Sequence, residues 1–139
     1  MTNYGYLKLC AASPRIKLAD PLANAEIIAA QAKDAAANGA GVILFPELCL
    51  TGCSCGDLFF SESLQEKTSL ALSKLLADTA GVSSAIVLGL PLTLGGRLAN
   101  CAAVLQNGKI MGIAPKSGIG PEERRWFAGS AFLCGISGI

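Results

Sequence analysis

Hydrophobic and polar positions divide the first part of the chain into a strand, a helix and a second strand. The side chains of residues 4–12 alternate between two faces, which is the period of a β-strand. Asp20-Pro21 marks a helix start, because an aspartate caps free N–H groups and a proline fits the first helical position. Asn38-Gly39 ends this helix, since glycine readily adopts the left-handed conformation. Residues 42–45 are all apolar, so we expect a central strand covered on both faces.

The rest of the chain continues the alternation of helix and strand and then forms a hairpin. An apolar stripe that begins near Ser63 predicts a second helix, and residues 84–90 predict a third buried strand. Residues 98–104 and 109–113 predict two further strands, joined by Asn107-Gly108, a pair that favours a tight hairpin turn. The order strand, helix, strand, helix, strand, hairpin is typical of an α/β layered domain.

Composition limits the kinds of protein that this chain can be. Its 139 residues are 52% hydrophobic and 15% charged, which suits one folded domain, and the formal net charge of +1 indicates no nucleic-acid or membrane surface. No apolar run could span a bilayer and no signal peptide is evident, so we expect a cytoplasmic protein whose six cysteines are reduced thiols. The absence of histidine excludes a histidine-based triad within these residues.

Two charged residues stand directly behind prolines at the ends of predicted strands. Glu47 follows the strand at 42–45, and Lys116 follows the strand at 109–113. Because α/β proteins build their sites at the carboxyl ends of strands, Glu47 could be a general base and Lys116 a cation that stabilises an oxyanion. Apolar surroundings would raise the pKa of the Glu47 carboxyl. The alternatives are a carboxylate that caps backbone N–H groups and a solvated loop lysine.

Three cysteines follow Glu47 closely, at Cys49, Cys53 and Cys55. Their spacing is not the paired C-x-x-C of zinc sites, and without histidine four ligands would require a further cysteine to converge on them. The pattern therefore favours thiols that pack or line a site, and we expect no metal site. The remaining cysteines are two in strand patterns, expected to be core residues, and one near the end of the chain: Cys10, Cys101 and Cys134.

Five short segments together resemble one family of enzymes. "FPEL", "LTG", "CGDLF", "APK" and "RRWF" are similar to motifs of the nitrilase, or carbon–nitrogen hydrolase, superfamily, and within it to the glutaminase domain of glutamine-dependent NAD(+) synthetases. The resemblance covers nearly the whole chain in order, so residues 1–139 are expected to be the N-terminal part of such a domain. It implies an α/β fold that is part of a four-layer α-β-β-α sandwich.

The resemblance also implies catalysis by a glutamate, a lysine and a cysteine. Glu47 matches the general base and Lys116 matches the cation beside the tetrahedral intermediate. The cysteine would attack the side-chain amide of glutamine, release ammonia and leave a glutamyl thioester for water to hydrolyse. The family implies a homo-oligomer and no cofactor in this domain. In that family, a separate synthetase domain uses ATP and Mg²⁺ to amidate deamido-NAD to NAD with that ammonia.

Three departures from the family change these expectations. The family's nucleophile follows a later strand, whereas Cys134 comes too early and lacks the usual acidic neighbour, so we expect no nucleophile in this chain and no activity from it alone. The loop between Lys116 and Trp126 is short and lacks the "LPNY"-type segment, which leaves Glu122 or Glu123 as the supporting second glutamate. The synthetase domain is absent from these 139 residues.

Two other interpretations stay open. The chain could be a fragment of a stand-alone amidase or nitrilase, which the downstream sequence would decide. It could also be a non-catalytic, degenerate homologue used for assembly, or a thiol or metal-binding module built on the three cysteines behind Glu47. Because an incomplete sandwich exposes sheet edges and apolar layers, we expect the chain to be marginally stable or prone to aggregation when produced alone.

Overall fold

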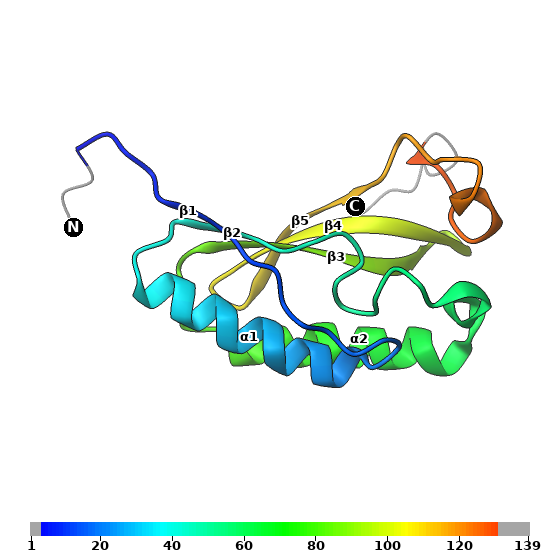
Figure 1. The fold of residues 1–139 in the computed structure, drawn as a ribbon, viewed down its shortest axis with the longest axis horizontal. Coiled ribbons are helices and arrows are strands. Elements are labelled where there is room, and N and C mark those ends of the chain that lie inside the picture. The colour runs from blue at the N-terminus through cyan, green and yellow to red at the C-terminus, as the bar shows by residue number, and fades with distance from the viewer. Residues whose placement is uncertain (1–3, 131–139) are drawn as a thin grey trace.

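A computed structural model describes residues 4–130 and shows one sheet with two long helices (Figure 1). Neither helix in these residues is long and apolar enough to cross a membrane. The predicted alternation of helices and strands in an α/β layered domain is confirmed. In chain order the elements are β1 (Leu9–Ala11), α1 (Pro21–Ala37), β2 (Val42–Leu44), the 3-10 helix η1 (Gly56–Phe60), α2 (Glu62–Asp78), β3 (Ala85–Leu94), β4 (Arg97–Gln106), β5 (Lys109–Pro115) and the 3-10 helix η2 (Glu123–Arg125).

The helix starts follow the capping signals in the sequence. At the start of α1 the Asp20 carboxylate accepts a hydrogen bond from the Ala23 N–H at 3.2 Å, and Pro21 is the first helical residue. At the start of α2 the Ser61 hydroxyl accepts the Leu64 N–H at 3.4 Å. Each contact satisfies a backbone donor that the helix leaves without an internal partner. Both helices therefore begin within two residues of the positions that the sequence indicates.

The strands agree with the sequence at the hairpin and differ from it at the first strand. Asn107 and Gly108 between β4 and β5 have φ of 50° and 70°, as a tight primed turn requires. The expected first strand over 4–12 is wrong in length, because the observed strand comprises only Leu9–Ala11. β1 is an edge strand beside the equally short β2, so the alternating residues before Leu9 have no strand to pair with.

The direction of the strands places the carboxyl ends of β2 and β5 on the same side of the sheet. The order is β1-β2-β3-β4-β5, with β1, β2 and β3 parallel and with antiparallel pairing of β3 to β4 and of β4 to β5. Two antiparallel steps bring β5 back to the direction of β2. The carboxyl ends of β2 and β5, which precede Glu47 and Lys116, therefore meet at one edge of the sheet.

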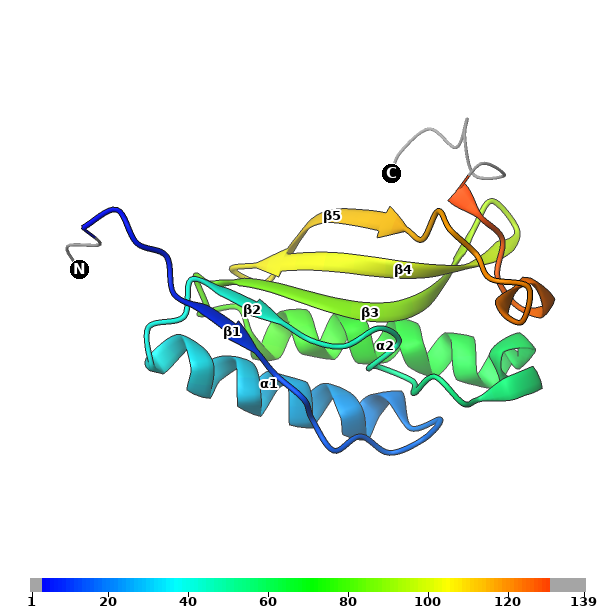
Figure 2. The ribbon, with the colours of Figure 1, turned by 45° about the horizontal axis from the view of Figure 1, so that its top comes forward.

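Both helices cover the same face of the sheet (Figure 2). The expectation that residues 42–45 are covered on both faces is wrong for the described residues: Ile43 is fully buried, whereas Leu44 on the opposite face is 52% exposed. The reason is that the second face has no layer over β2 in this part of the chain. The main core lies between α1, α2 and the sheet, and its largest fully buried side chains are Ile28, Ile43, Leu50, Leu75, Ile86, Leu88, Leu90 and Leu105.

A second, smaller cluster lies beneath the edge where the strands end. Phe59 of η1 packs edge-on against Phe127, with the ring centroids 4.9 Å apart, and Leu48 and Leu98 belong to the same cluster. These contacts join the segments that follow β2 and β5. The cluster therefore supports the surface on which Glu47 and Lys116 stand.

Candidate active site

The backbone turn that contains Glu47 crosses β3 at close distance. The turn behind β2 lies directly over Gly89 of β3, where a Cβ atom would be 2.2 Å from the Leu48 nitrogen and 2.7 Å from the Glu47 Cα. The Gly89 carbonyl accepts the Leu50 N–H at 3.2 Å. Leu48 has a φ of 52°, a conformation that costs free energy in a residue with a side chain. Because residue 89 has no side chain, the turn passes over β3 and reaches β4 and β5.

Lys116 lies between two carboxylates. Its Nζ is 2.8 Å from Glu47 Oε1 and 3.0 Å from Glu123 Oε1. The fold thus brings together the predicted pair of Glu47 and Lys116, which are 69 residues apart in the sequence. Of the two supporting candidates, η2 brings Glu123 to the lysine, whereas Glu122 is exposed and forms no hydrogen bond or ion pair with Lys116.

The pKa values of Glu47 and Lys116 are shifted by their contacts in this cluster. The hydrogen bond from Lys116 lowers the pKa of Glu47. Burial has a smaller, opposing effect, and the hydrogen bond from Asn100 lowers the pKa further. Hydrogen bonds to Glu47 and Glu123 raise the pKa of Lys116. The expectation of a raised Glu47 pKa is therefore wrong, because the side chain is 50% exposed and lies against a cation. At neutral pH the pair is a carboxylate and an ammonium.

Asn100 is a member of this cluster that sequence reasoning missed. Its Nδ2 donates to Glu47 Oε1 at 2.5 Å, and its backbone carbonyl accepts the Lys116 N–H at 2.8 Å. A signal was present, since an asparagine interrupts the apolar pattern of the strand at 98–104. A buried amide needs a partner, and here the partner is the candidate base.

Two of the cysteines behind Glu47 are packing residues. Cys49 is 2% exposed, and burial raises the pKa of its thiol to about 11. Cys55 is buried in the cluster with Phe59. Cys101 of β4 is buried as well, and its pKa is raised to about 11 by the same cause. A thiol with a raised pKa is a poor nucleophile, so these residues fit the expected packing role.

Cys53 differs because it is exposed at the rim of the site. Its thiol donates to the Glu47 backbone carbonyl at 3.3 Å. Partial burial, and then the charges of Glu47 and Glu123, raise the pKa of this thiol, so it is not an activated nucleophile. Residues 4–130 contain no group of three or more histidine, cysteine or acidic side chains that could hold a metal ion. Cys134, which we expected not to be the nucleophile, lies outside the described residues.

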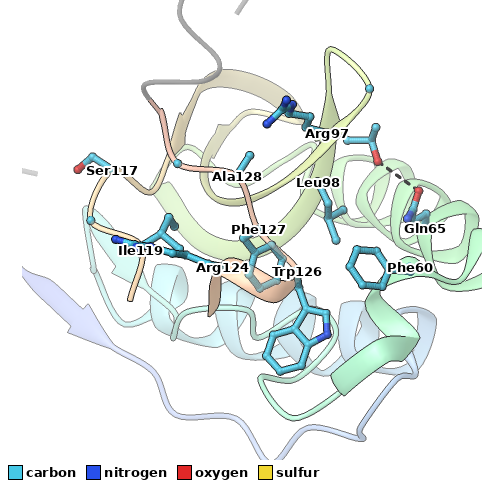
Figure 3. A pocket seen from close by; sticks show the side chains of 14 residues that line it. Phe60, Gln65, Arg97, Leu98, Ser117, Ile119, Arg124, Trp126, Phe127 and Ala128 are labelled. Atoms are coloured by element: carbon cyan, nitrogen blue, oxygen red, sulfur yellow. Dashed lines mark hydrogen bonds between the residues drawn. The ribbon is translucent and has the colours of Figure 1, made fainter. Parts of the chain in front are cut away.

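Two hollows adjoin the cluster. The smaller, of about 470 Å³, is lined by Glu47, Asn100 and Lys116 together with apolar residues of the sheet. The larger, of about 950 Å³, is lined by aromatic side chains of η1 and of the segment that contains η2, by Arg124 of that segment and by Arg97 of β4 (Figure 3). Ser117 borders both. The larger hollow lacks the carboxylate and the lysine, so of the two hollows only the smaller one contains the candidate acid–base pair.

A clamp between Asp57 and the segment of η2 joins η1 to the part of the chain that carries Glu123. Arg125 donates from Nε and Nη2 to the two Asp57 carboxylate oxygens at 2.8 and 2.9 Å, and Trp126 Nε1 donates to Oδ1 at 3.0 Å. The hydrogen bonds from Arg125 and Trp126 lower the pKa of Asp57 to about 2. Sequence reasoning missed this pairing, although Asp57 lies in "CGDLF" and its partners lie in "RRWF".

Replacing Asp57 by asparagine is expected to loosen this clamp and to shift the fluorescence of Trp126 to longer wavelength. Trp126 is the single tryptophan of the sequence, so its emission reports on this contact alone. In the unaltered chain the emission should stay constant from pH 7 to 4. The Asp57 pKa is about 2 in the folded chain and about 4 in the unfolded chain, so the clamp stabilises the fold fully above about pH 4. This stabilisation is lost as the pH falls through 2.

The matched control for this fluorescence experiment is Asp78→Asn. Asp78 is a half-buried carboxylate that also has a lowered pKa, but its partner is Lys74 on the same helix. This variant should leave the emission unchanged. Equal emission of the Asp57→Asn variant and the unaltered chain would contradict the clamp.

Comparison with known proteins identifies the family of the chain. The carbon–nitrogen hydrolase family matches residues 8–129. The glutamine-dependent NAD(+) synthetase of Mycobacterium tuberculosis is 32% identical over 125 residues, which cover 90% of this chain and 18% of that relative. A solved structure of a glutamine-dependent NAD(+) synthetase from Cytophaga hutchinsonii matches with a TM-score of 0.80 and 25% identity, over 88% of this chain and 22% of that chain.

An amidase from Nesterenkonia sp. has the same fold, with a TM-score of 0.75 and 24% identity over 88% of this chain and 48% of that chain. The described helices and sheet are thus part of the expected nitrilase-type α-β-β-α sandwich. The chain spans 18% of the length of the mycobacterial relatives that it matches. Since the family match runs from before β1 to beyond η2 and includes Glu47, Lys116 and Glu123, the chain belongs to the carbon–nitrogen hydrolase family.

Proposed function

We propose that this chain is the N-terminal part of the glutaminase domain of a glutamine-dependent NAD(+) synthetase. The observation that carries the proposal is the placement of Lys116 between Glu47 and Glu123, in a chain that is 32% identical to such a synthetase. In the proposal, Glu47 is the general base, Lys116 stabilises the tetrahedral intermediate, and Glu123 supports the lysine. The substrate of the site is glutamine.

The charge states support this chemistry at neutral pH. Lys116 lowers the pKa of Glu47, so the carboxylate is ionised and can take the proton of a thiol. Glu47 and Glu123 raise the pKa of Lys116, so its ammonium can stabilise the negative oxygen of an intermediate. The thiol sulfur then bonds to the amide carbon of glutamine, ammonia leaves with a proton returned by the base, and water hydrolyses the thioester.

Other parts of the proposed enzyme lie outside the described residues. The thiol pKa is raised in four of the described cysteines, namely Cys49, Cys53, Cys55 and Cys101. The nucleophilic cysteine is therefore proposed to come from a later segment, and the 139-residue chain alone is proposed to be inactive. ATP and Mg²⁺ would be bound by a synthetase domain that uses the ammonia to convert deamido-NAD to NAD. We also propose that the parent protein is a cytoplasmic homo-oligomer.

The experiment that tests the proposal uses the native gene product. Its intact mass is measured in cells, and the purified product is given deamido-NAD, ATP and Mg²⁺ with either glutamine or ammonium. The proposal expects a product much heavier than 14.2 kDa that makes NAD from both nitrogen sources. The 139-residue chain, assayed in parallel, should release no ammonia from glutamine.

The other outcomes identify the alternatives. A product that hydrolyses simple amides but makes no NAD would be a stand-alone amidase. A product of 139 residues that hydrolyses no amide would be a non-catalytic homologue, and its state of assembly would then be the property to measure. Release of ammonia by the 139-residue chain, abolished by Glu47→Gln, would contradict the proposed inactivity.

A further inference from the structure

Asn100 is a buried polar residue that contacts both members of the candidate pair. It lies in β4 and is 3% exposed. Its side-chain amide donates to Glu47 Oε1 at 2.5 Å, and its backbone carbonyl accepts the Lys116 N–H at 2.8 Å. One residue of the sheet thus sets the distance between the carboxylate and the backbone that carries the lysine.

The two carboxylate oxygens of Glu47 have different surroundings. Oε1 accepts hydrogen bonds from Asn100 and from Lys116. Within residues 4–130, no hydrogen bond to Oε2 is present. An oxygen whose lone pairs are held by two donors is a weaker proton acceptor than its free neighbour. The arrangement therefore distinguishes a held oxygen from an available one.

We propose that Asn100 is a positioning residue that fixes the rotation of the Glu47 carboxylate, so that Oε1 is held and Oε2 takes the proton of the nucleophile. This inference rests on the proposed function and adds to it the atom that acts as base. Lys116 alone would set the rotation less firmly, because its long side chain is 35% exposed and divides its bonds between Glu47 and Glu123. Asn100 is short and buried, and it adds no charge.

A purely structural asparagine would use the backbone for its partners, and the chain contains one. Asn24 of α1 is fully buried, and its side chain bonds to the backbone of Lys17 and to the Leu50 carbonyl. Asn100 instead donates to an ionised side chain, which makes the bond charge-assisted. The two residues are matched in type and burial, and they differ in whether they contact the base.

Kinetics of the native gene product test this inference. Asn100→Asp keeps the shape of the side chain but replaces the donor by a second carboxyl group, which disfavours the charged form of Glu47. We expect kcat for glutamine hydrolysis to fall by about 100-fold with little change in KM, as is usual for a misplaced catalytic group. The acid limb of the pH profile should move to higher pH.

Two further variants separate positioning from stability. Asn100→Ala removes the donor without adding a charge and should also move the acid limb to higher pH. Asn24→Ala should lower the melting temperature and leave the acid limb where it is, since Asn24 has no contact with Glu47. Variants of Asn100 that lower the melting temperature but leave both kcat and the acid limb unchanged would overturn the inference.

A measurement without turnover distinguishes failure of the inference from failure of the proposed function. The Glu47 carboxyl is titrated by ¹³C NMR in the native gene product and in its Asn100→Ala variant, where the pKa should be higher. If the native product hydrolyses no glutamine but this shift appears, the proposed function is wrong and the contact between Asn100 and the carboxylate is confirmed. If glutamine is hydrolysed and neither the pKa nor the acid limb moves, the inference is wrong and the function stands.

Discussion

The Glu47→Gln variant of the native gene product is expected to lose glutamine-dependent NAD synthesis by about 10²- to 10⁴-fold, the usual contribution of a general base. The same variant should keep ammonium-dependent synthesis, because ammonia bypasses the step that needs the base. Glutamine is close in shape to glutamate but cannot accept the proton. Lys116 also stays in place, since Glu123 still holds its ammonium. Initial rates with the two nitrogen sources measure this directly.

Glu122→Gln is the matched control for this experiment. Glu122 is exposed next to Glu123, and within the described residues it forms neither a hydrogen bond nor an ion pair with the lysine. Its variant should retain both activities. Equal loss of both activities in Glu47→Gln would indicate a collapsed protein, and retention of glutamine-dependent synthesis would exclude Glu47 as the base.

Gly89→Ala is expected to destabilise the chain by about 3 kcal/mol or more, at the upper end of overpacking effects. The added Cβ would lie 2.2 Å from the Leu48 nitrogen, and a backbone atom cannot turn away as a side chain can. Relief requires the turn that carries Glu47 to lift away from β3. We therefore expect the same substitution in the native gene product to abolish glutamine hydrolysis, because Glu47 would move away from Lys116 and Asn100.

Gly112→Ala is the control, since Gly112 is also a strand glycine and a Cβ built on it meets nothing within 4 Å. Its midpoint in urea should stay close to that of the unaltered chain, whereas the midpoint of Gly89→Ala should fall clearly. Equal midpoints of the two variants would show that the crossing over β3 can relax. This result would contradict the prediction that Gly89 is needed to place Glu47.

Local signals predicted most of the elements because their causes lie within a few residues. Asp20-Pro21 starts α1 through a cap that spans three residues, and Asn107-Gly108 closes the hairpin through its own backbone conformation. Glu47 and Lys116 were found in the same way, as charges behind prolines at strand ends. The family resemblance of the motifs was then confirmed by the match over residues 8–129.

Properties that depend on distant neighbours were missed or misjudged. The pKa of Glu47 was expected to be raised from the apolar residues beside it in sequence, but Lys116, far along the chain, lowers it. The choice between Glu122 and Glu123 depended on which of the two the short helix η2 turns toward Lys116. The expected cover on both faces of β2 depended on layers that residues next to it do not reveal.

The amino-acid sequence thus specified the elements, their order and the two charges of the candidate pair, because caps, turns and apolar periodicity act over short distances. The assembly of these charges into a site came from tertiary contacts between segments far apart in the chain. Gly89 lets the Glu47 turn cross β3, and Asn100 donates to the carboxylate that arrives there. Glu123 reaches Lys116 from a segment that Asp57 joins to η1. Such contacts are decided by strand order and register, which place residues together according to space and not according to their separation along the chain.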